Sequence, residues 1–149
     1  MKQKMILYNL KEKLGDVDFD LTFPSKITFI WDSGGEDKRY LWHMLSAYYR
    51  AGSRARQHIK MAFINWSNLE TMHLTVMELL KRYNDMLIVI DNADIILRDK
   101  ERAYIRADKN NQYLIFGRDC DGLGVHPLAV GALKIKDRKG TFIFERIYS

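Results

Sequence analysis

Apolar residues occupy every second position of DVDFDLTF, residues 16–23. This strict alternation predicts a strand with one face buried and an acidic face in water. The apolar residues of KMILYNL, just before it, predict a partner strand joined across Leu14, Gly15 and Asp16. The chain is therefore expected to begin with a hairpin, which Pro24 ends.

Four later apolar runs lack alternation, which is typical of strands buried on both faces in a parallel sheet. The runs are ITFIW at 27–31, IKMAFI at 59–64, MLIVI at 86–90 and QYLIF at 112–116. A closing pair, LAVGALKIK and TFIFERIY, flanks Asp137-Arg138-Lys139-Gly140 and predicts a second hairpin.

Helical spacing separates the four runs. A first helix is expected from the spacing of Leu41, Met44, Leu45 and Tyr48 and extends to Gly52. Ser67 and Glu70 form a capping box before a second helix. The face of that helix is expected to carry Leu69, His73, Val76, Met77 and Leu80, with His73 in the core. A charged third helix is expected at 94–107.

This order of elements predicts an α/β fold: a mostly parallel sheet flanked by helices, with antiparallel hairpins at both chain ends. With 149 residues, of which 47% are hydrophobic, we expect one domain over residues 1–149. Cys120 is the only cysteine, which excludes a disulfide framework and a Cys-rich zinc site. The N-terminal apolar run is too short for a signal peptide, and no segment is long enough to span a membrane. We therefore expect a cytoplasmic protein.

The stretch 27–45, ITFIWDSGGEDKRYLWHML, has the layout of a strand, a phosphate-binding turn and a helix. MLIVIDNAD at 86–94 adds a hydrophobic strand that ends in an aspartate. Over residues 26–118 the chain resembles a P-loop NTPase, most like the small AAA-type ATPase domains. The resemblance implies ATP and Mg²⁺ as cofactors. It assigns nucleotide contacts to Gly34, Gly35, Lys38, Arg39, Asp91 and Arg118, and metal ordering to Asp91 and Asp94.

The phosphate loop departs from the family pattern. With Lys38 in the lysine position, Asp32 and Asp37 replace the two glycines and Arg39 replaces the hydroxyl residue. A guanidinium has no acceptor for a metal ion. Ser33-Gly34-Gly35-Glu36 also reads as a plain capping box at a helix start. The family pattern has an acidic residue after the aspartate to activate water; Asn92 stands there, so the general base is missing unless Asp94 substitutes for it. The sequence therefore predicts a degenerate P-loop protein: a non-hydrolysing accessory or regulatory module that binds a macromolecular partner.

Two other functions stay open. An atypical Mg²⁺-dependent ATPase or nuclease would use Asp32, Asp91 and Asp94, because Asp32 and Asp91 are expected at the carboxyl ends of adjacent parallel strands. A nucleic-acid binder would use a basic stretch in a chain whose net charge is +5. That stretch carries Arg50, Arg54, Arg56 and Lys60. The edges of the hairpins also offer a route to a homodimer.

Overall fold

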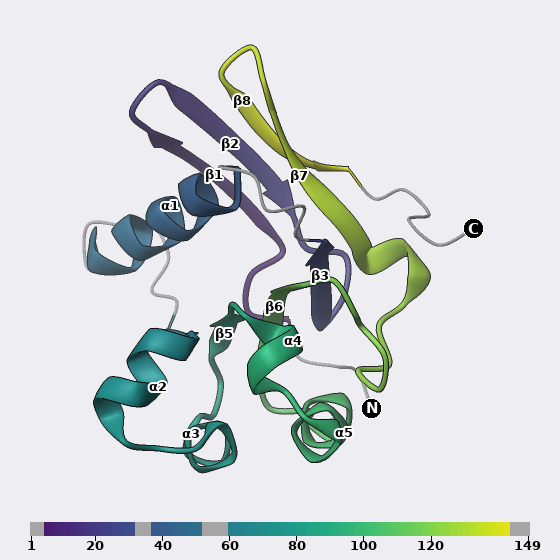
Figure 1. Ribbon diagram of the computed structural model, residues 1–149. Helices are drawn as coiled ribbons and strands as arrows, with labels where there is room; N and C mark the ends of the chain where they lie inside the picture. Colours follow the sequence, from purple (N-terminus) through teal and green to yellow (C-terminus); the bar gives the residue numbers. More distant parts are fainter. Residues whose placement is uncertain (1–4, 32–36, 52–59, 144–149) are drawn as a thin grey trace.

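A computed structural model describes residues 5–31, 37–51 and 60–143 (Figure 1). In these residues eight strands form one curled sheet, in the order β1-β2-β8-β7-β3-β6-β5-β4. The strands are β1 (Asn9–Leu14), β2 (Val17–Thr22), β3 (Ile27–Trp31), β4 (Met61–Ile64), β5 (Leu87–Ile90), β6 (Gln112–Gly117), β7 (Val130–Lys136) and β8 (Lys139–Ile143). The helices are α1 (Asp37–Ala51), α2 (Trp66–Met72), α3 (Val76–Arg82), α4 (Ala93–Ile96) and α5 (Asp99–Ala107), and Pro127–Ala129 form one 3₁₀ turn.

The α/β class expected from the sequence is confirmed, but the sheet is mixed. The strands β4, β5, β6, β3 and β7 pair in parallel, and so do β2 and β8, whereas the hairpins β1–β2 and β7–β8 are antiparallel. The expected "mostly parallel" sheet is therefore corrected to a mixed sheet, in which antiparallel hairpins are joined to parallel strands. Strand β7 belongs to both parts, because it pairs with β3 on one side and with β8 on the other. The closing hairpin thus continues the sheet and curls it back toward β2.

The parallel strands are buried on both faces because apolar residues alternate between two cores. In β5, Ile88 and Ile90 face the core formed with α3, α4 and α5, while Leu87 and Val89 face the core on the opposite side. The second core lies inside the curl of the sheet. There α1 contributes Leu41, Met44 and Leu45, which pack with buried residues of β1 and β2.

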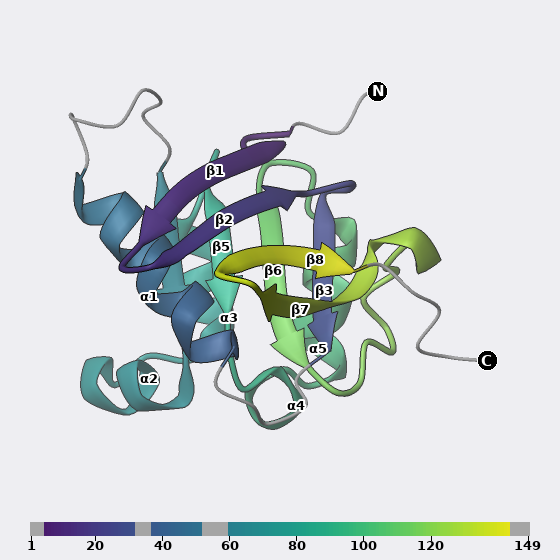
Figure 2. The ribbon, with the colours of Figure 1, turned by 90° about the horizontal axis from the view of Figure 1, so that it is seen from above.

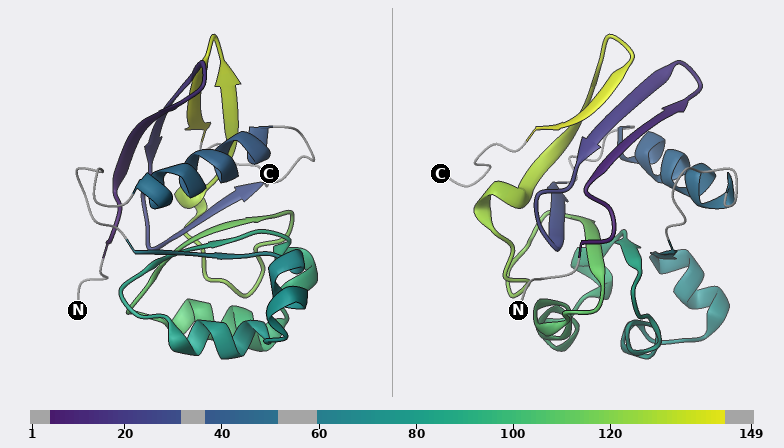
Figure 3. Two further views of the ribbon diagram at one scale, coloured as in Figure 1. Left: turned by 90° about the vertical axis from the view of Figure 1, so that its left-hand side faces the viewer. Right: turned by 180° about the vertical axis from the view of Figure 1, so that it is seen from behind.

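The views in Figure 3 show this layering. Helix α1 lies between the hairpins and the parallel strands, and α3 and α5 lie on the other side of those strands. The chain that follows β3 therefore enters the curl, whereas the chain that follows β4 or β5 covers the outer face. Helix α1 carries Lys38 to the end of β5, where it meets Asp91.

The expectation of a single second helix, which rested on the Ser67–Glu70 capping box, is wrong. The chain forms two short helices, α2 and α3, because His73 takes the left-handed conformation with φ 54° and ends α2. The observed caps are Asn65 for α2 and Thr75 for α3, and each forms a capping box. His73 is exposed and does not belong to the core.

The first strand begins at Asn9, later than the apolar residues of KMILYNL suggest. The segment before it is held by Gln112, whose side chain is fully buried. Its Oε1 accepts hydrogen bonds from the backbone N–H groups of Ile6 and Leu7, at 2.8 and 2.7 Å, and its Nε2 donates to the Leu7 carbonyl at 2.7 Å. One amide side chain therefore replaces strand pairing between this segment and β6.

A polar network closes the sheet end where β3 and β6 begin. The buried Lys26 ammonium donates to the carbonyls of Ile105, Arg106 and Asp108 at the end of α5. The Tyr113 hydroxyl donates to Asp108 Oδ2 at 2.6 Å. Burial lowers the pKa of Lys26, and the nearby Asp108 opposes this shift. Burial and then the hydrogen bond to Asp108 raise the pKa of Tyr113 well above its ordinary value.

Candidate functional site

Lys38 and Asp91, two of the residues that sequence reasoning singled out, meet where the parallel strands end. Asp91 follows β5 directly, and Lys38 is the second residue of α1. The Lys38 Nζ atom lies 3.3 Å from Asp91 Oδ1, and the two side chains are 26% and 18% exposed. Residues 53 positions apart therefore form an ion pair that is partly shielded from water, at the edge where open α/β sheets bind their ligands.

Asp91 is held in place by the strands beside it. Its backbone N–H donates to the Ile64 carbonyl at the end of β4, at 2.9 Å. Its Oδ1 also accepts the backbone N–H of Asn92 at 2.7 Å. The carboxylate is therefore oriented by its own backbone, and Oδ1 is the oxygen that meets Lys38.

Asn92 turns the chain from β5 into α4. It adopts the left-handed conformation with φ 58°, which asparagine tolerates better than most residues. Its Oδ1 accepts the backbone N–H of Trp66 at 3.2 Å, which links the start of α2 to the end of β5. The Asn92 side chain is thus part of a structural link between α2 and β5.

Asp94 has a different set of partners. Its two carboxylate oxygens accept the backbone N–H of Arg118, at 3.1 and 2.9 Å, and its Oδ1 accepts that of Asp119 at 3.0 Å. Arg102 Nη2 lies 3.9 Å from the same Oδ1. Asp94 therefore ties the first turn of α4 to the chain that leaves β6. Its expected role as a metal ligand stays a prediction, and a bound ion would share oxygens that already accept backbone hydrogen bonds.

Arg118, to which the resemblance assigns a nucleotide contact, follows the last residue of β6, the fourth of the parallel strands along the chain. The close packing there depends on Gly117. A Cβ atom at Gly117 would lie 3.1 Å from Asp94 Oδ1 and 3.2 Å from the Ala93 Cβ atom. Glycine therefore lets the end of β6 approach α4, which brings Arg118 to the same edge as Asp91.

Sequence reasoning missed Arg102, the residue that organises the loop after β6. Its guanidinium is buried and donates to the carbonyls of Leu97, Asp119 and Asp121, at 3.1, 2.7 and 2.9 Å. A charged residue on a charged helix carried no signal of this role. The missed Gly117 could have been found, since a glycine at the end of a buried strand often marks a close approach of backbones.

Several predicted residues lie outside the described part of the chain: Asp32, Gly34, Gly35, Arg54 and Arg56. Arg39 is exposed on α1, and Lys60 is exposed just before β4. Arg50 belongs to the last turn of α1. The basic stretch proposed for nucleic-acid binding is therefore described only at its two ends.

The expectation that Asp32 and Asp91 follow adjacent strands is wrong. Strand β6 pairs with β3 on one side and β5 on the other, so it separates the two. Sequence order suggested neighbours, but the crossover after β5 inserts β6 between them. Within residues 5–31, 37–51 and 60–143, no group of three or more His, Cys, Asp or Glu side chains is arranged to hold a metal ion.

No family model, curated protein or solved structure matches this chain. In the described residues, no helix combines the length and apolar character needed to cross a membrane. Any functional conclusion therefore depends on the site itself.

Proposed function

We propose that the protein is a nucleotide-binding regulatory module of the P-loop type, with a degenerate phosphate loop and without efficient hydrolysis. The observation that carries the proposal is the 3.3 Å separation of Lys38 Nζ and Asp91 Oδ1. The resemblance stated from the sequence gives these residues complementary tasks: Lys38 contacts phosphate and Asp91 orders Mg²⁺ through water. Two motifs far apart in the chain contribute a cation and a carboxylate to one edge, as those tasks require.

The order of the strands supports the same proposal. Numbered along the chain, the parallel strands β7, β3, β6, β5 and β4 are fifth, first, fourth, third and second. Strands β3 and β5, which precede Lys38 and Asp91, are separated by β6 alone, so their carboxyl ends lie at one edge of the sheet, where parallel α/β sheets place ligands.

The residues present fit a bound nucleotide in part. When bound, ATP with Mg²⁺ would place negative charge beside Lys38 and a cation beside Asp91. The ammonium of Lys38 would exchange one anionic partner for another, and the Asp91 carboxylate would keep a cationic neighbour. Arg118, on the loop held by Asp94, would add a positive charge at the same edge.

Hydrolysis lacks support at Asn92, the position where the family pattern has a general base. Asn92 has an amide in place of a carboxylate, and an amide does not accept a proton from water near neutral pH. Its Oδ1 also accepts the Trp66 N–H, so the side chain is engaged in the link between α2 and β5. Nucleotide binding without turnover suits a regulatory or accessory role, in which a bound nucleotide changes the affinity of the protein for a partner.

Thermal unfolding with and without ATP and Mg²⁺ tests the proposal. Ligand at 100 times its Kd stabilises the folded state by about 2.7 kcal/mol. For a chain of this size, that is a rise of roughly 5–10 °C in unfolding temperature. We expect this rise in the wild type and in the control Lys81→Met, a change at an exposed lysine of α3.

The same rise should be lost in Lys38→Met and in Asp91→Ala, and phosphate release from ATP should stay at the level of a blank. An equal rise in Lys38→Met and wild type would refute the role of Lys38. Phosphate release that depends on Asp91 would refute the absence of hydrolysis and favour the ATPase alternative.

A further inference from the structure

One face of the curled sheet carries lysines that no part of the proposed nucleotide site uses. We call it the basic sheet face and define it by Lys11, Lys13, Lys134, Lys136 and Lys139. These residues come from β1, β7 and β8, and all are exposed. Figure 2 shows β1, β2, β8 and β7 side by side with no helix in front of them. The face is therefore open to a partner.

The register of the sheet brings these lysines together. Lys13 lies opposite Asp18, Asp18 lies opposite Lys139, and Lys139 lies opposite Lys136. One row across four strands thus contains three lysines and one aspartate. The next row places Lys11 opposite Asp20, and Lys134 opposite Thr141. Three of the five lysines lie within residues 134–139, and the register adds Lys11 and Lys13 from the distant first hairpin.

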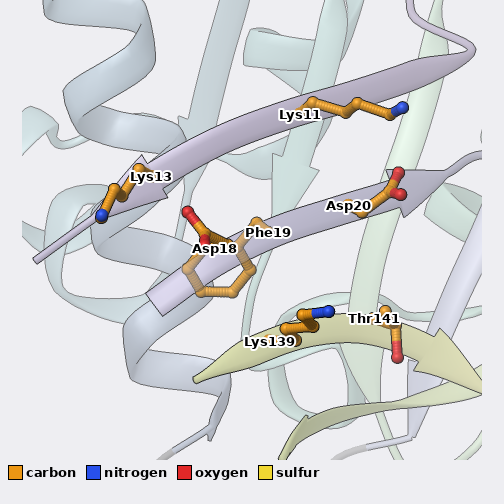
Figure 4. Close-up of a pocket in the computed structure, with 7 residues that line it drawn as sticks. All are labelled: Lys11, Lys13, Asp18, Phe19, Asp20, Lys139 and Thr141. Carbon is orange, nitrogen blue, oxygen red and sulfur yellow. The ribbon is translucent and has the colours of Figure 1, made fainter. Parts of the chain in front are cut away.

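The positive charge is unevenly distributed over the basic sheet face. Asp18 and Asp20 are the acidic residues among the outward-facing positions of these strands. In Figure 4 their carboxylates point toward β1, the strand of Lys13 and Lys11, and Lys139 lines the opposite side. In the described part of the chain no ion pair engages Lys134, Lys136 or Lys139. The β7–β8 half of the face therefore has the excess of positive charge.

A groove runs along this face. Strands β2 and β8 pair at Asp18 with Lys139 and at Phe19 with Gly140, and a hollow of about 500 Å³ lies between them. Lys11, Asp20, Lys139 and Thr141 are among the residues that line it. The Phe19 ring is 2% exposed, so it packs below the groove and offers no stacking surface. A ligand here would be recognised by charge and hydroxyl contacts.

We propose that the basic sheet face binds the phosphodiester backbone of single-stranded nucleic acid. Lysines spaced along two strands match a chain that carries a regular series of negative charges, and each phosphate contact releases condensed counterions. The groove has the volume of a small-ligand pocket, which suits one strand better than a flat layer of lipid headgroups. Lysine acts as a point charge without bidentate geometry, so binding is independent of base sequence.

The test is fluorescence anisotropy of the full chain with a labelled single-stranded DNA of mixed sequence, over a range of salt concentrations. Duplex DNA of the same sequence, the corresponding RNA and anionic phospholipid vesicles serve as separate probes. The test variant is Lys134→Gln with Lys136→Gln and Lys139→Gln. The matched control is Lys81→Gln with Lys100→Gln and Lys109→Gln, which removes the same charge from exposed positions elsewhere.

Each lost contact lowers the slope of log K against log salt by about 0.7 for a single strand, so three lost contacts lower it by about 2. With binding at 1 M salt unchanged, that slope corresponds to a loss of about 100-fold in affinity at 0.1 M. We expect this loss in the test variant and wild-type affinity in the control. The proposal would be overturned if both variants lost affinity equally, or if the test variant bound as tightly as the wild type. It would also be overturned if the wild type bound neither DNA nor RNA, or if it bound vesicles or duplex DNA more tightly than single strands.

The two proposals fail separately. The test variant keeps Lys38 and Asp91, so its stabilisation by ATP and Mg²⁺ should equal that of the wild type. Loss of nucleic-acid binding with intact nucleotide binding assigns the effect to the basic sheet face. Nucleic-acid binding in a wild type that binds no nucleotide would leave this inference standing without the proposed nucleotide site.

Discussion

The ion pair between Lys38 and Asp91 can be measured directly by a double-mutant cycle. We consider Lys38→Met, which keeps the length of the side chain and removes its charge, and Asp91→Asn, which keeps an oxygen that can accept the Asn92 N–H. Comparing the two single variants, the double variant and the wild type isolates the energy of the pair from the other contacts of each residue.

The magnitude follows from the geometry. Two unit charges 3.3 Å apart attract by about 5 kcal/mol at an effective dielectric of about 20. Most of this is offset by desolvation, since the side chains are 26% and 18% exposed. Fully exposed pairs contribute about 0.2–1 kcal/mol, so a coupling energy near 1 kcal/mol is expected for this more shielded pair.

The assay is urea unfolding of the four proteins at low and high salt, with free energies from linear extrapolation. The coupling should shrink at high salt, because ions screen a partly exposed pair. A coupling within about 0.3 kcal/mol of zero at low salt would mean that the residues act independently. That result would refute the pairing on which the proposed site rests.

Three further predictions concern the fold. Gln112→Leu should lower the free energy of unfolding by about 3 kcal/mol, because three backbone groups of the segment before β1 lose their hydrogen-bond partner. Chemical unfolding measures this change. A loss below about 1 kcal/mol would contradict the role of Gln112 in holding that segment. The folded-state pKa of Tyr113 is raised, so its contribution to stability is present below the unfolded pKa of about 10 and is lost as pH rises through the folded value. Tyr113→Phe should flatten the fall in unfolding temperature above pH 10, and an unchanged pH profile would exclude this cause. Asp137 and Arg138 both have positive φ, so Asp137→Asn with Arg138→Gly should stabilise the β7–β8 turn by about 0.5–1 kcal/mol, measured by chemical unfolding; a loss of stability would show that the turn is not strained.

The buried strands could be predicted because the sequence carries their signal locally. A run such as MLIVI, at 86–90, leaves no polar face and so must be covered on both sides. The break between α2 and α3 was not visible, because Leu69, Val76 and Leu80 keep a helical spacing across it. Local capping by Thr75 and Glu78 outweighs that continuity, and His73 accepts a left-handed backbone.

The candidate site was predictable where one residue directly follows a strong strand, as Asp91 follows β5 and Arg118 follows β6. The pairing of Asp91 with Lys38 depends on the order of the strands in the sheet, and no short segment of the sequence encodes that order. The basic sheet face was missed for the same reason. Lys134, Lys136 and Lys139 read as ordinary solvent-facing positions of a hairpin until the register aligns them with β1 and β2.

Calorimetric titration of the wild-type chain with ATP, with and without Mg²⁺, tests the nucleotide proposal most directly. Saturable heat for one site per chain is expected, with tighter binding when Mg²⁺ is present, because Asp91 would then order the metal beside phosphate held by Lys38. Absence of heat with ATP, with ADP and with ATP plus Mg²⁺ would contradict the proposed function. The pairing of Lys38 and Asp91 would then be a structural contact only.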